Sequence, residues 1–255
     1  MSPRRRLLLG AALAVLLAVL AVVGVRLINR ADPVARPDQA RPGPVLLVPG
    51  YGGSRTGLSQ LAARLRAEGR TASVLTLPGE GTGDLLVQAG TVDAAVRAAL
   101  DEGAPSVDVV GYSAGGVAVK LWVDRHRSAD SARRIVTLGS PLHGTRIAGA
   151  GSALAPGSCP AACRQLAPGS ALLDTVDEEP VPDGLPWLSL WTDDDETVQP
   201  PDSARLDGAT NLAVQTLCPD ARISHSALPT DPIVTALVLE ALGTTPWSAP
   251  ASCPA

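Results

Sequence analysis

Residues 107–116 read VDVVGYSAGG, and this stretch decides the fold that we predict for the chain. The run Val107–Val110, apolar except for Asp108, is typical of a buried strand, and the residues after the motif have helical spacing. Between them, GYSAG at 111–115 matches G-x-S-x-G, in which a serine occupies a sharp turn from strand to helix. Glycines at both ends of the motif leave room for the strand and the helix to pack against that turn. In a chain with 25 glycines the pattern alone is weak, and a glycine-rich turn with an incidental serine is the alternative. The strand before it and the helix after it favour Ser113 as a nucleophile.

Apolar runs that fit strands alternate with segments that fit helices on both sides of this motif. The predicted strands are 45–48, 71–76, 107–110, 135–138, 187–191 and 212–216, and the predicted helices are 58–69, 92–100, 114–127 and 233–242. Such alternation predicts an α/β fold, a mostly parallel sheet with helices on both faces and right-handed crossovers. Residues 142–186 show no strong periodicity, so they either shape a site or form a surface excursion.

The N-terminal region has the pattern of a membrane segment. Three arginines at 4–6 precede the uncharged run Leu7–Val25, whose 19 residues would span about 28 Å as a helix, close to the thickness of a bilayer core. We therefore expect residues 1–28 to form a signal anchor, with the arginines in the cytoplasm and the rest of the chain outside. The alternative is a signal peptide that is cleaved, which would leave a secreted protein. Residues 29–44 are rich in proline and predict a tether, so the catalytic domain is expected to span 45–255.

The composition and charge of the chain argue against a nucleic acid as its partner. Residues 1–41 carry seven Arg and two Asp, a local charge of +5, whereas the remainder carries 14 basic and 23 acidic residues, a charge of −9. The chain has no Phe, so its core depends on Leu, Val and Ala, and it offers few aromatic rings for stacking against bases. We expect no nucleic-acid partner, because phosphate binding requires a basic surface. We expect the protein to be a monomer.

Four cysteines predict two disulfides in an exported domain. Four cysteines allow three connectivities, and the sequence does not choose among them firmly. Local pairing favours Cys159–Cys163, which leaves Cys218 and Cys253 to pair with each other. The spacing is not that of a zinc site, and we expect no metal.

A serine hydroxyl needs a base, and the chain has only three histidines to supply one. With this type of serine motif the order along the chain is serine, acid, histidine. His126 falls near the end of the helix after the motif and is expected to be solvated, and His143 comes too early. His225, which follows the last predicted strand, is therefore the candidate base.

The acid is expected directly after the predicted strand 187–191, where four acidic residues are consecutive. We favour Asp195, because Val198 three residues later could anchor the loop and turn that carboxylate inward. Asp194 is the alternative. Four consecutive acidic residues usually form a solvated loop, or less often a calcium site, so not all of them are expected to be functional.

The tetrahedral oxyanion of acyl transfer requires two backbone N–H donors. Ala114, directly after the serine, is expected to supply one donor at the start of its helix. The turn GYG at 50–52, after the first strand, is expected to supply the other through the backbone of Tyr51. The Tyr51 ring could line the acyl site or simply pack.

Taken together, these motifs resemble those of the α/β-hydrolase superfamily, and more narrowly of its bacterial secreted lipases. The similar stretches are LVPGYGG at 47–53, GYSAGG at 111–116, TLGSPLHGT at 137–145 and CRQL at 163–166, and Pro49 stands where many members have histidine. The resemblance implies hydrolysis of carboxylic esters through an acyl-enzyme on Ser113, with His225 and Asp195 completing the triad. It implies an ester or lipid substrate and no cofactor.

Two other functions fit the same motifs. An acyltransferase or thioesterase acting on envelope lipids would keep the triad and change the acceptor. A hydrolase-fold module that only binds ligands would not need the triad, although all three of its residues are present in the expected order.

Overall fold

The computed structural model describes residues 15, 17, 36–177 and 179–254. The chain divides into two compact units, residues 1–35 and 36–255. Apart from Val15 and Leu17, which are helical, the predicted anchor lies outside the described residues. Within the described part of the chain, no helix is both long and apolar enough to cross a membrane. The description that follows concerns the second unit.

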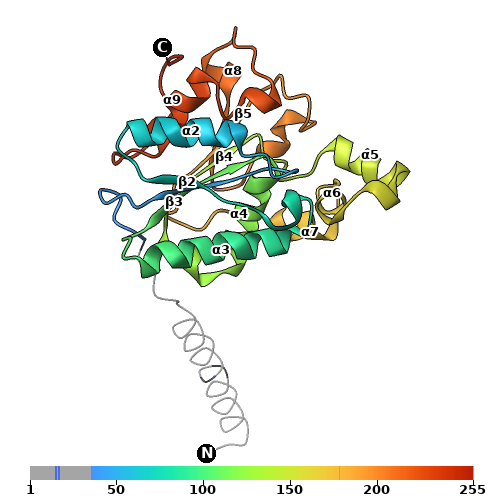
Figure 1. Cartoon of the computed structure of the whole chain (residues 1–255), viewed down its shortest axis with the longest axis horizontal. Coiled ribbons are helices and arrows are strands. Elements are labelled where there is room, and N and C mark those ends of the chain that lie inside the picture. Colours follow the sequence, from blue (N-terminus) through green and yellow to red (C-terminus); the bar gives the residue numbers. More distant parts are fainter. Residues whose placement is uncertain (1–14, 16, 18–35, 178, 255) are drawn as a thin grey trace, which may run out of the picture. The chain divides into compact units, whose positions relative to one another are not determined.

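A six-stranded sheet forms the centre of this unit, with strand order β2-β1-β3-β4-β5-β6 and every neighbouring pair parallel (Figure 1). The strands are β1 (Val45–Val48), β2 (Ala72–Val74), β3 (Val107–Tyr112), β4 (Ala132–Leu138), β5 (Trp187–Trp191) and β6 (Thr210–Ala213). β1 and β3 to β5 are almost entirely buried, as expected for strands covered on both faces. All the strands run in one direction, so their carboxyl ends meet at one edge of the sheet.

Helices cover both faces of the sheet. The α-helices are α2 (Thr56–Ala67), α3 (Leu85–Asp101), α4 (Ala114–Arg125), α5 (Arg146–Leu154), α6 (Ala161–Gln165), α7 (Ala171–Asp177), α8 (Val214–Leu217) and α9 (Pro232–Ala241). The 3-10 helices are η1 (Pro78–Gly81), η2 (Arg127–Ser131), η3 (Pro156–Ser158), η4 (Pro201–Ala204) and η5 (His225–Ala227). Side chains of α2 and α9 form one core with Val45 and Leu47, whereas those of α3 and α4 form another with Leu46 and Val48. Successive β1 residues therefore enter opposite cores, as the alternation of a strand requires.

The predicted alternation of strands and helices is confirmed, and the differences concern the ends of elements. Helix α3 begins seven residues before the predicted start, because the Asp84 side chain accepts the Leu86 N–H and caps it. The strand predicted to continue to residue 216 ends at Ala213, where pairing with β5 stops, and the chain turns into α8. Residues 142–186, for which the sequence predicts no element, contain the three short α-helices α5 to α7. Only Ala148 of α5 is buried, so apolar periodicity is almost absent there.

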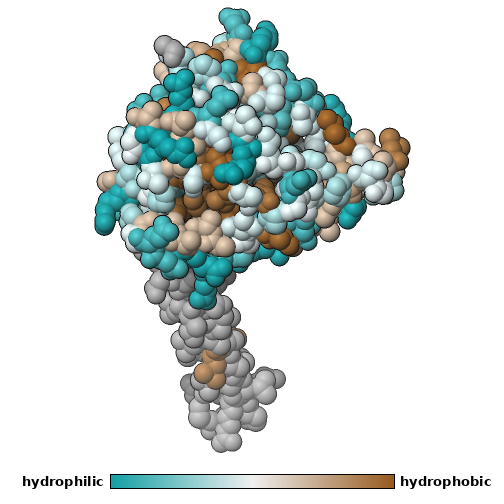
Figure 2. Space-filling view, viewed as in Figure 1, coloured by the Kyte–Doolittle hydropathy of each residue, from teal (hydrophilic) through white to brown (hydrophobic). Residues whose placement is uncertain are grey.

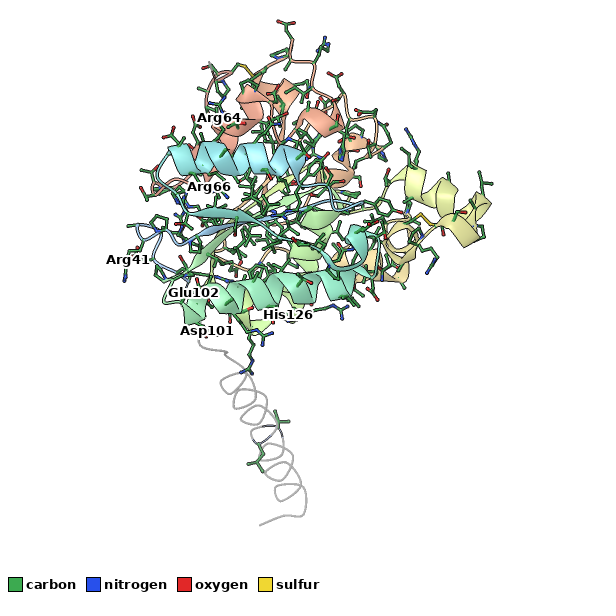
Figure 3. All side chains as sticks on the ribbon, in the orientation of Figure 1. Arg41, Arg64, Arg66, Asp101, Glu102 and His126 are labelled. Carbon is green, nitrogen blue, oxygen red and sulfur yellow. A yellow bond between two sulfur atoms is a disulfide. The ribbon has the colours of Figure 1, made fainter. Side chains whose placement is uncertain are left out.

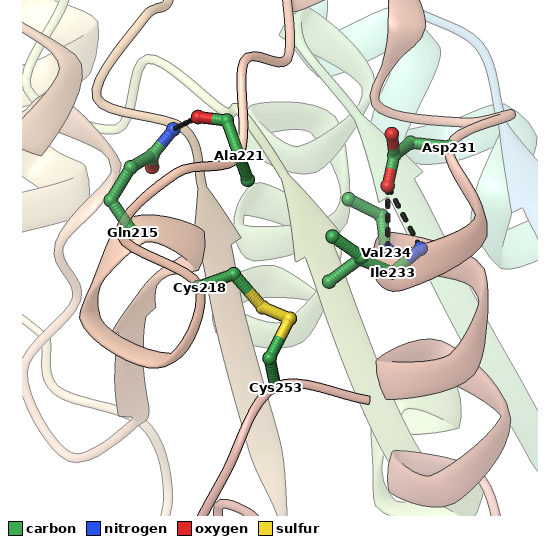
Figure 4. Close-up of a disulfide and its surroundings, with 7 residues drawn as sticks. All are labelled: Gln215, Cys218, Ala221, Asp231, Ile233, Val234 and Cys253. Carbon is green, nitrogen blue, oxygen red and sulfur yellow. Dashed lines mark hydrogen bonds between the residues drawn. A yellow bond between two sulfur atoms is a disulfide. The ribbon is translucent and has the colours of Figure 1, made fainter. Parts of the chain in front are cut away.

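Two disulfides are present, and their pairing is the one that local spacing favoured: Cys159–Cys163 and Cys218–Cys253. The second joins the end of α8 to the C-terminal tail (Figure 4). Close by, Asp231 caps α9 by accepting the N–H groups of Ile233 and Val234 (Figure 4). Cap and disulfide together hold the segment that follows the last strand.

A cluster of buried charges lies near the amino end of the sheet. Asp108 at the start of β3 accepts hydrogen bonds from Arg70 and Arg133, and its side chain is completely buried. Arg133 and Arg134 also donate to the carbonyl groups at the end of α9, where the helix dipole favours positive charge. Gln39, in the part of the predicted tether that is described, accepts from both arginines. The cluster thus joins the N-terminal segment, the sheet and the last helix.

We predict that Asp108→Ala lowers the free energy of unfolding by about 3–5 kcal/mol, because it leaves buried guanidinium groups without their counter-charge. Urea denaturation of the purified domain measures the change. The matched control is Asp101→Asn at the exposed end of α3 (Figure 3), which is expected to change stability by less than about 0.5 kcal/mol. Equal stability of the two variants would contradict the role assigned to the cluster.

Candidate active site

Ser113 occupies a strained turn between β3 and α4. Its backbone has φ 53° and ψ −129°, outside the regions that residues with a Cβ normally adopt. The turn is closely packed: a Cβ at Gly111 would lie 2.6 Å from the Cα of Gly116, and one at Gly115 would lie 2.4 Å from the Pro49 carbonyl oxygen. The glycines of the motif are therefore required by the backbone that surrounds the serine.

His225 lies beside this serine although 112 positions separate them. Its Nε2 is 3.0 Å from Ser113 Oγ, and its Nδ1 is 2.6 Å from Asp195 Oδ2. A carboxylate only accepts hydrogen bonds, so the proton is on Nδ1 and Nε2 is free to accept the serine hydroxyl. All three residues are at least nine-tenths buried. The three side chains form one continuous hydrogen-bonded series.

The acidic loop after β5 presents Asp195, and not Asp194, to the imidazole. Asp195 is 1% exposed, and its Oδ1 accepts the backbone N–H groups of Thr197 and Val198. These two bonds fix the carboxylate so that Oδ2 faces His225. Asp194 is exposed and its carboxylate contacts Gln215.

The other two histidines lie elsewhere. His143 is exposed, and its Nδ1 lies 3.1 Å from the Ser203 carbonyl oxygen. The expectation that His126 is solvated is wrong in part: it is half-buried, with Nδ1 3.4 Å from Asp93 on α3 (Figure 3). The reason is that α3 and α4 pack together, which places the end of α4 against the Asp93 side chain.

The two expected oxyanion donors lie on either side of the serine. Ala114 begins α4, and the turn that contains Tyr51 adjoins the serine, because a Cβ at Gly50 would lie 2.8 Å from that of Ser113. Among the described residues, no acceptor pairs with the backbone N–H of Tyr51 or Ala114. Both groups are therefore available to an incoming oxygen, and the start of α4 adds a favourable dipole.

An apolar pocket of about 270 Å³ opens beside Ser113. Its walls come from Tyr51, from the segment between β4 and α5, from α5 and α6, and from the loop after β5: Pro141, Thr145, Ile147, Ala148, Gly151, Cys163, Leu166, Thr197 and Val198. None of these described wall residues carries a charged side chain. Helix α5 also carries exposed apolar side chains, with Ile147 58% and Leu154 85% exposed, and Figure 2 shows apolar surface on this projecting region.

The contacts of three residues at the site were not predicted from the sequence, although Glu196 was one of the four acids considered after the strand 187–191. Gly139, at φ 52°, directly follows β4 and lies against Asp195 and His225, where a Cβ would lie 3.1 Å from the carboxylate. Tyr112 and Glu196 contact His225. The only sequence signal was that Tyr112 precedes the serine and Glu196 follows the acid.

No metal centre accompanies the site in the described residues, where no group of three or more His, Cys, Asp or Glu side chains is arranged to hold an ion. The chemistry open to this arrangement is that of a serine nucleophile with an oriented base.

No protein-family model matches the chain, and no curated protein sequence matches it. Solved structures do resemble it. Lipase B from Aspergillus fumigatus has a TM-score of 0.68 and 22% identity, covering 80% of this chain and 53% of the fungal chain. The mature Bacillus licheniformis lipase BlEst2 has a TM-score of 0.68 and 21% identity, covering 83% of this chain and 96% of the other. Monoacylglycerol lipase from Paleococcus ferrophilus has a TM-score of 0.50 and 16% identity, covering 70% and 85%.

These likenesses establish the fold. The chain has the α/β-hydrolase fold, as its motifs predicted, and it shares that fold with bacterial and fungal lipases. It spans about half the length of the fungal lipase chain.

We predict that Gly111→Ala destabilises the domain by about 3 kcal/mol or more, because the new methyl group meets backbone that cannot move aside. Thermal and urea unfolding measure the loss. Gly90→Ala is the control: it lies inside α3 with no atom within 4 Å of the position that a methyl group would take, and helix propensity predicts a gain of about 0.5–1 kcal/mol. Similar effects of the two substitutions would refute the steric account of the turn.

Proposed function

We propose that the chain is a serine hydrolase that cleaves carboxylic esters, as a lipase or carboxylesterase does. The observation that carries the proposal is the series Ser113–His225–Asp195 beside an apolar pocket. An activated serine next to an uncharged cavity suits an ester whose acyl group is apolar. The solved structures with this fold include lipases, which supports the same reaction class.

The proposed reaction has two halves. In the first, Ser113 Oγ attacks the ester carbonyl while His225 Nε2 takes the hydroxyl proton, and Asp195 stabilises the imidazolium that forms. The N–H groups of Tyr51 and Ala114 donate to the tetrahedral oxyanion. The intermediate collapses when the alcohol leaves with the proton from His225, and an acyl-serine remains.

In the second half, a water molecule attacks the acyl-serine carbonyl. His225 takes a proton from the water, the same two N–H groups hold the new oxyanion, and the carboxylic acid leaves as Ser113 regains its proton. The sequence of steps needs no cofactor.

The pocket argues for acyl groups without charge. Its walls consist mainly of aliphatic residues, together with Cys163, the uncharged Thr145 and Thr197, and Tyr51, which is 46% exposed. A charged acyl group would lose its hydration there without gaining a partner. Acyl transfer to an acceptor other than water would use the same triad, and no observation favours it.

Location is part of the proposal. The arginines at 4–6 before the apolar run Leu7–Val25 support export with an N-terminal anchor, or secretion after cleavage. The two disulfides support an oxidising compartment.

We predict that Ser113→Ala, His225→Ala and Asp195→Asn each lower kcat on p-nitrophenyl esters by at least about a thousandfold, while Asp194→Asn stays within about threefold of the wild type. Circular dichroism checks that all four variants fold. Equal residual activity in Asp195→Asn and Asp194→Asn would contradict the assignment of Asp195 as the acid. An active Ser113→Ala variant would contradict the proposed serine hydrolase.

We predict that Ala148→Met narrows the pocket and shifts the preference toward short acyl chains. The ratio of kcat/KM for octanoate to that for acetate is expected to fall by about tenfold, since lost apolar contact penalises only the longer chain. A series of soluble esters measures the ratio. Ala150→Met is the matched control, because Ala150 is exposed on the same helix and lies outside the pocket. A ratio that is unchanged by Ala148→Met would place the acyl chain elsewhere.

A further inference from the structure

The peptide groups of His225 are held from both sides by side chains. Its backbone N–H donates to Glu196 Oε2 at 3.0 Å, and its carbonyl oxygen accepts the Tyr112 hydroxyl at 3.2 Å. Glu196 directly follows the acid Asp195, and Tyr112 directly precedes the nucleophile Ser113. Tyr112 and Glu196, the chain neighbours of Ser113 and Asp195, thus both bond the backbone of His225.

The Tyr112 ring adds a contact with the imidazole itself. The ring centroids are 5.1 Å apart and the planes are inclined by 31°. Burial, with Asp195 and Glu196 adding to it, raises the pKa of Tyr112 to about 12. The hydroxyl therefore keeps its proton in neutral and mildly alkaline solution, and it remains a donor to the His225 carbonyl.

His225 needs such support because of the backbone on which it lies. It begins η5, a turn of three residues, and the described residues between α8 and η5 form no regular element. Such loops move more than strands and helices do. Two further side chains tie this segment to the loop after β5: the Thr192 hydroxyl donates to the Ile223 carbonyl oxygen, and Gln215 donates to the Ala221 carbonyl oxygen while accepting the Asp193 N–H. Neither of them bonds to His225 itself.

The imidazole has to meet two partners at once. Nδ1 faces Asp195 and Nε2 faces Ser113, and a displacement of about 1 Å can cost a hundredfold in rate. Fixing both the N–H and the C=O of His225 limits rotation of the peptide groups from which the side chain extends. The carbonyl also accepts the Leu228 N–H at 3.3 Å, but that bond lies within the turn itself, so among the described residues the Tyr112 hydroxyl is what ties this carbonyl to the sheet.

We propose that Glu196 and Tyr112 are positioning residues that hold the His225 backbone so that its imidazole bridges Asp195 and Ser113. Neither residue touches the reacting atoms, and each acts through His225. The inference rests on the proposed ester hydrolysis, since positioning has a catalytic consequence only if His225 is the base.

The test compares Tyr112→Phe, Glu196→Ala, Glu196→Gln and the double variant Tyr112→Phe/Glu196→Ala in the full chain. Tyr112→Phe keeps the ring and removes the hydrogen bond. Glu196→Gln keeps an oxygen that can accept the His225 N–H, whereas Glu196→Ala does not. Asp193→Ala is the matched control, since Asp193 is exposed on the same loop and, among the described residues, bonds only through its backbone N–H, to Gln215.

We expect kcat on a soluble p-nitrophenyl ester to fall about 10- to 100-fold in Tyr112→Phe and in Glu196→Ala, with KM within about twofold of wild type. Glu196→Gln is expected to recover most of kcat, and Asp193→Ala to equal the wild type. Proton NMR supplies a readout that does not depend on turnover. The downfield His225 Nδ1–H resonance is identified by its loss in His225→Ala. It is expected to broaden in Tyr112→Phe and in Glu196→Ala and to stay sharp in Glu196→Gln.

The results distinguish failure of the positioning role from failure of the proposed ester hydrolysis. If the wild type hydrolyses esters and all variants match it in kcat and in the His225 resonance, the positioning role is overturned. The role is also overturned if Glu196→Gln is as impaired as Glu196→Ala, because the carboxylate charge and not the backbone bond would then matter. If the wild type neither hydrolyses esters nor reacts with a fluorophosphonate, the proposed function fails, while a broadened resonance in the variants would still support the effect on His225.

Discussion

The backbone of Ser113 is held at φ 53° and ψ −129°, and the rest of the site depends on this constraint. Alone, a residue with a Cβ would leave such a conformation at a gain of roughly 1–3 kcal/mol. It persists because β3 enters the turn in a parallel sheet, α4 leaves it packed against β1, and glycines let the two backbones approach. The strain raises the hydroxyl above the edge of the sheet, toward the histidine. A relaxed turn would direct it elsewhere.

The two ends of the sheet carry different groups: a cluster of buried charges at the amino end and the candidate active site at the carboxyl end. At the amino end, Asp108 and the arginines around it join the sheet to the last helix and to the segment that contains Gln39. At the carboxyl end, the segments after β1, β3, β5 and β6 bring together Tyr51, Ser113, Asp195 and His225, to which the proposed function assigns the oxyanion turn, the nucleophile, the acid and the base. Because ionic interactions weaken with distance, the charges around Asp108 can stabilise the fold at one end of the sheet without perturbing the His225 imidazole at the other end.

The region around α5 has different physical properties from the rest of the domain. Residues 143–170 contain no acidic side chain, although the chain after residue 41 carries a net charge of −9. Within α5 only Ala148 is buried, and two glycines weaken the helix, so tertiary packing contributes little to it. The same helix lines the pocket beside Ser113. The strand ends of the sheet and the loops after them therefore hold the hydrogen-bonded series, whereas a helix with a single buried residue forms part of the pocket wall.

The sequence by itself determined the α/β class, the order of strands and helices along the chain, the serine turn and the favoured cysteine pairs. Most of these rest on residues close together in the chain: apolar runs of strand length, glycines around one serine, and cysteines four positions apart, which leave Cys218 and Cys253 to pair with each other. It left Asp194 and Asp195 both open as the acid, and it missed α5 to α7, Gly139, and the contacts of Tyr112 and Glu196 with His225. Only the tertiary structure showed these, because two N–H groups within the loop after β5 orient the Asp195 carboxylate inward. The two groups that bond the His225 backbone come from the end of β3, 113 residues away, and from the loop after β5, 29 residues away. Local patterns specify which residues form a turn or a strand, whereas the direction of a side chain depends on partners that the fold brings from a distance.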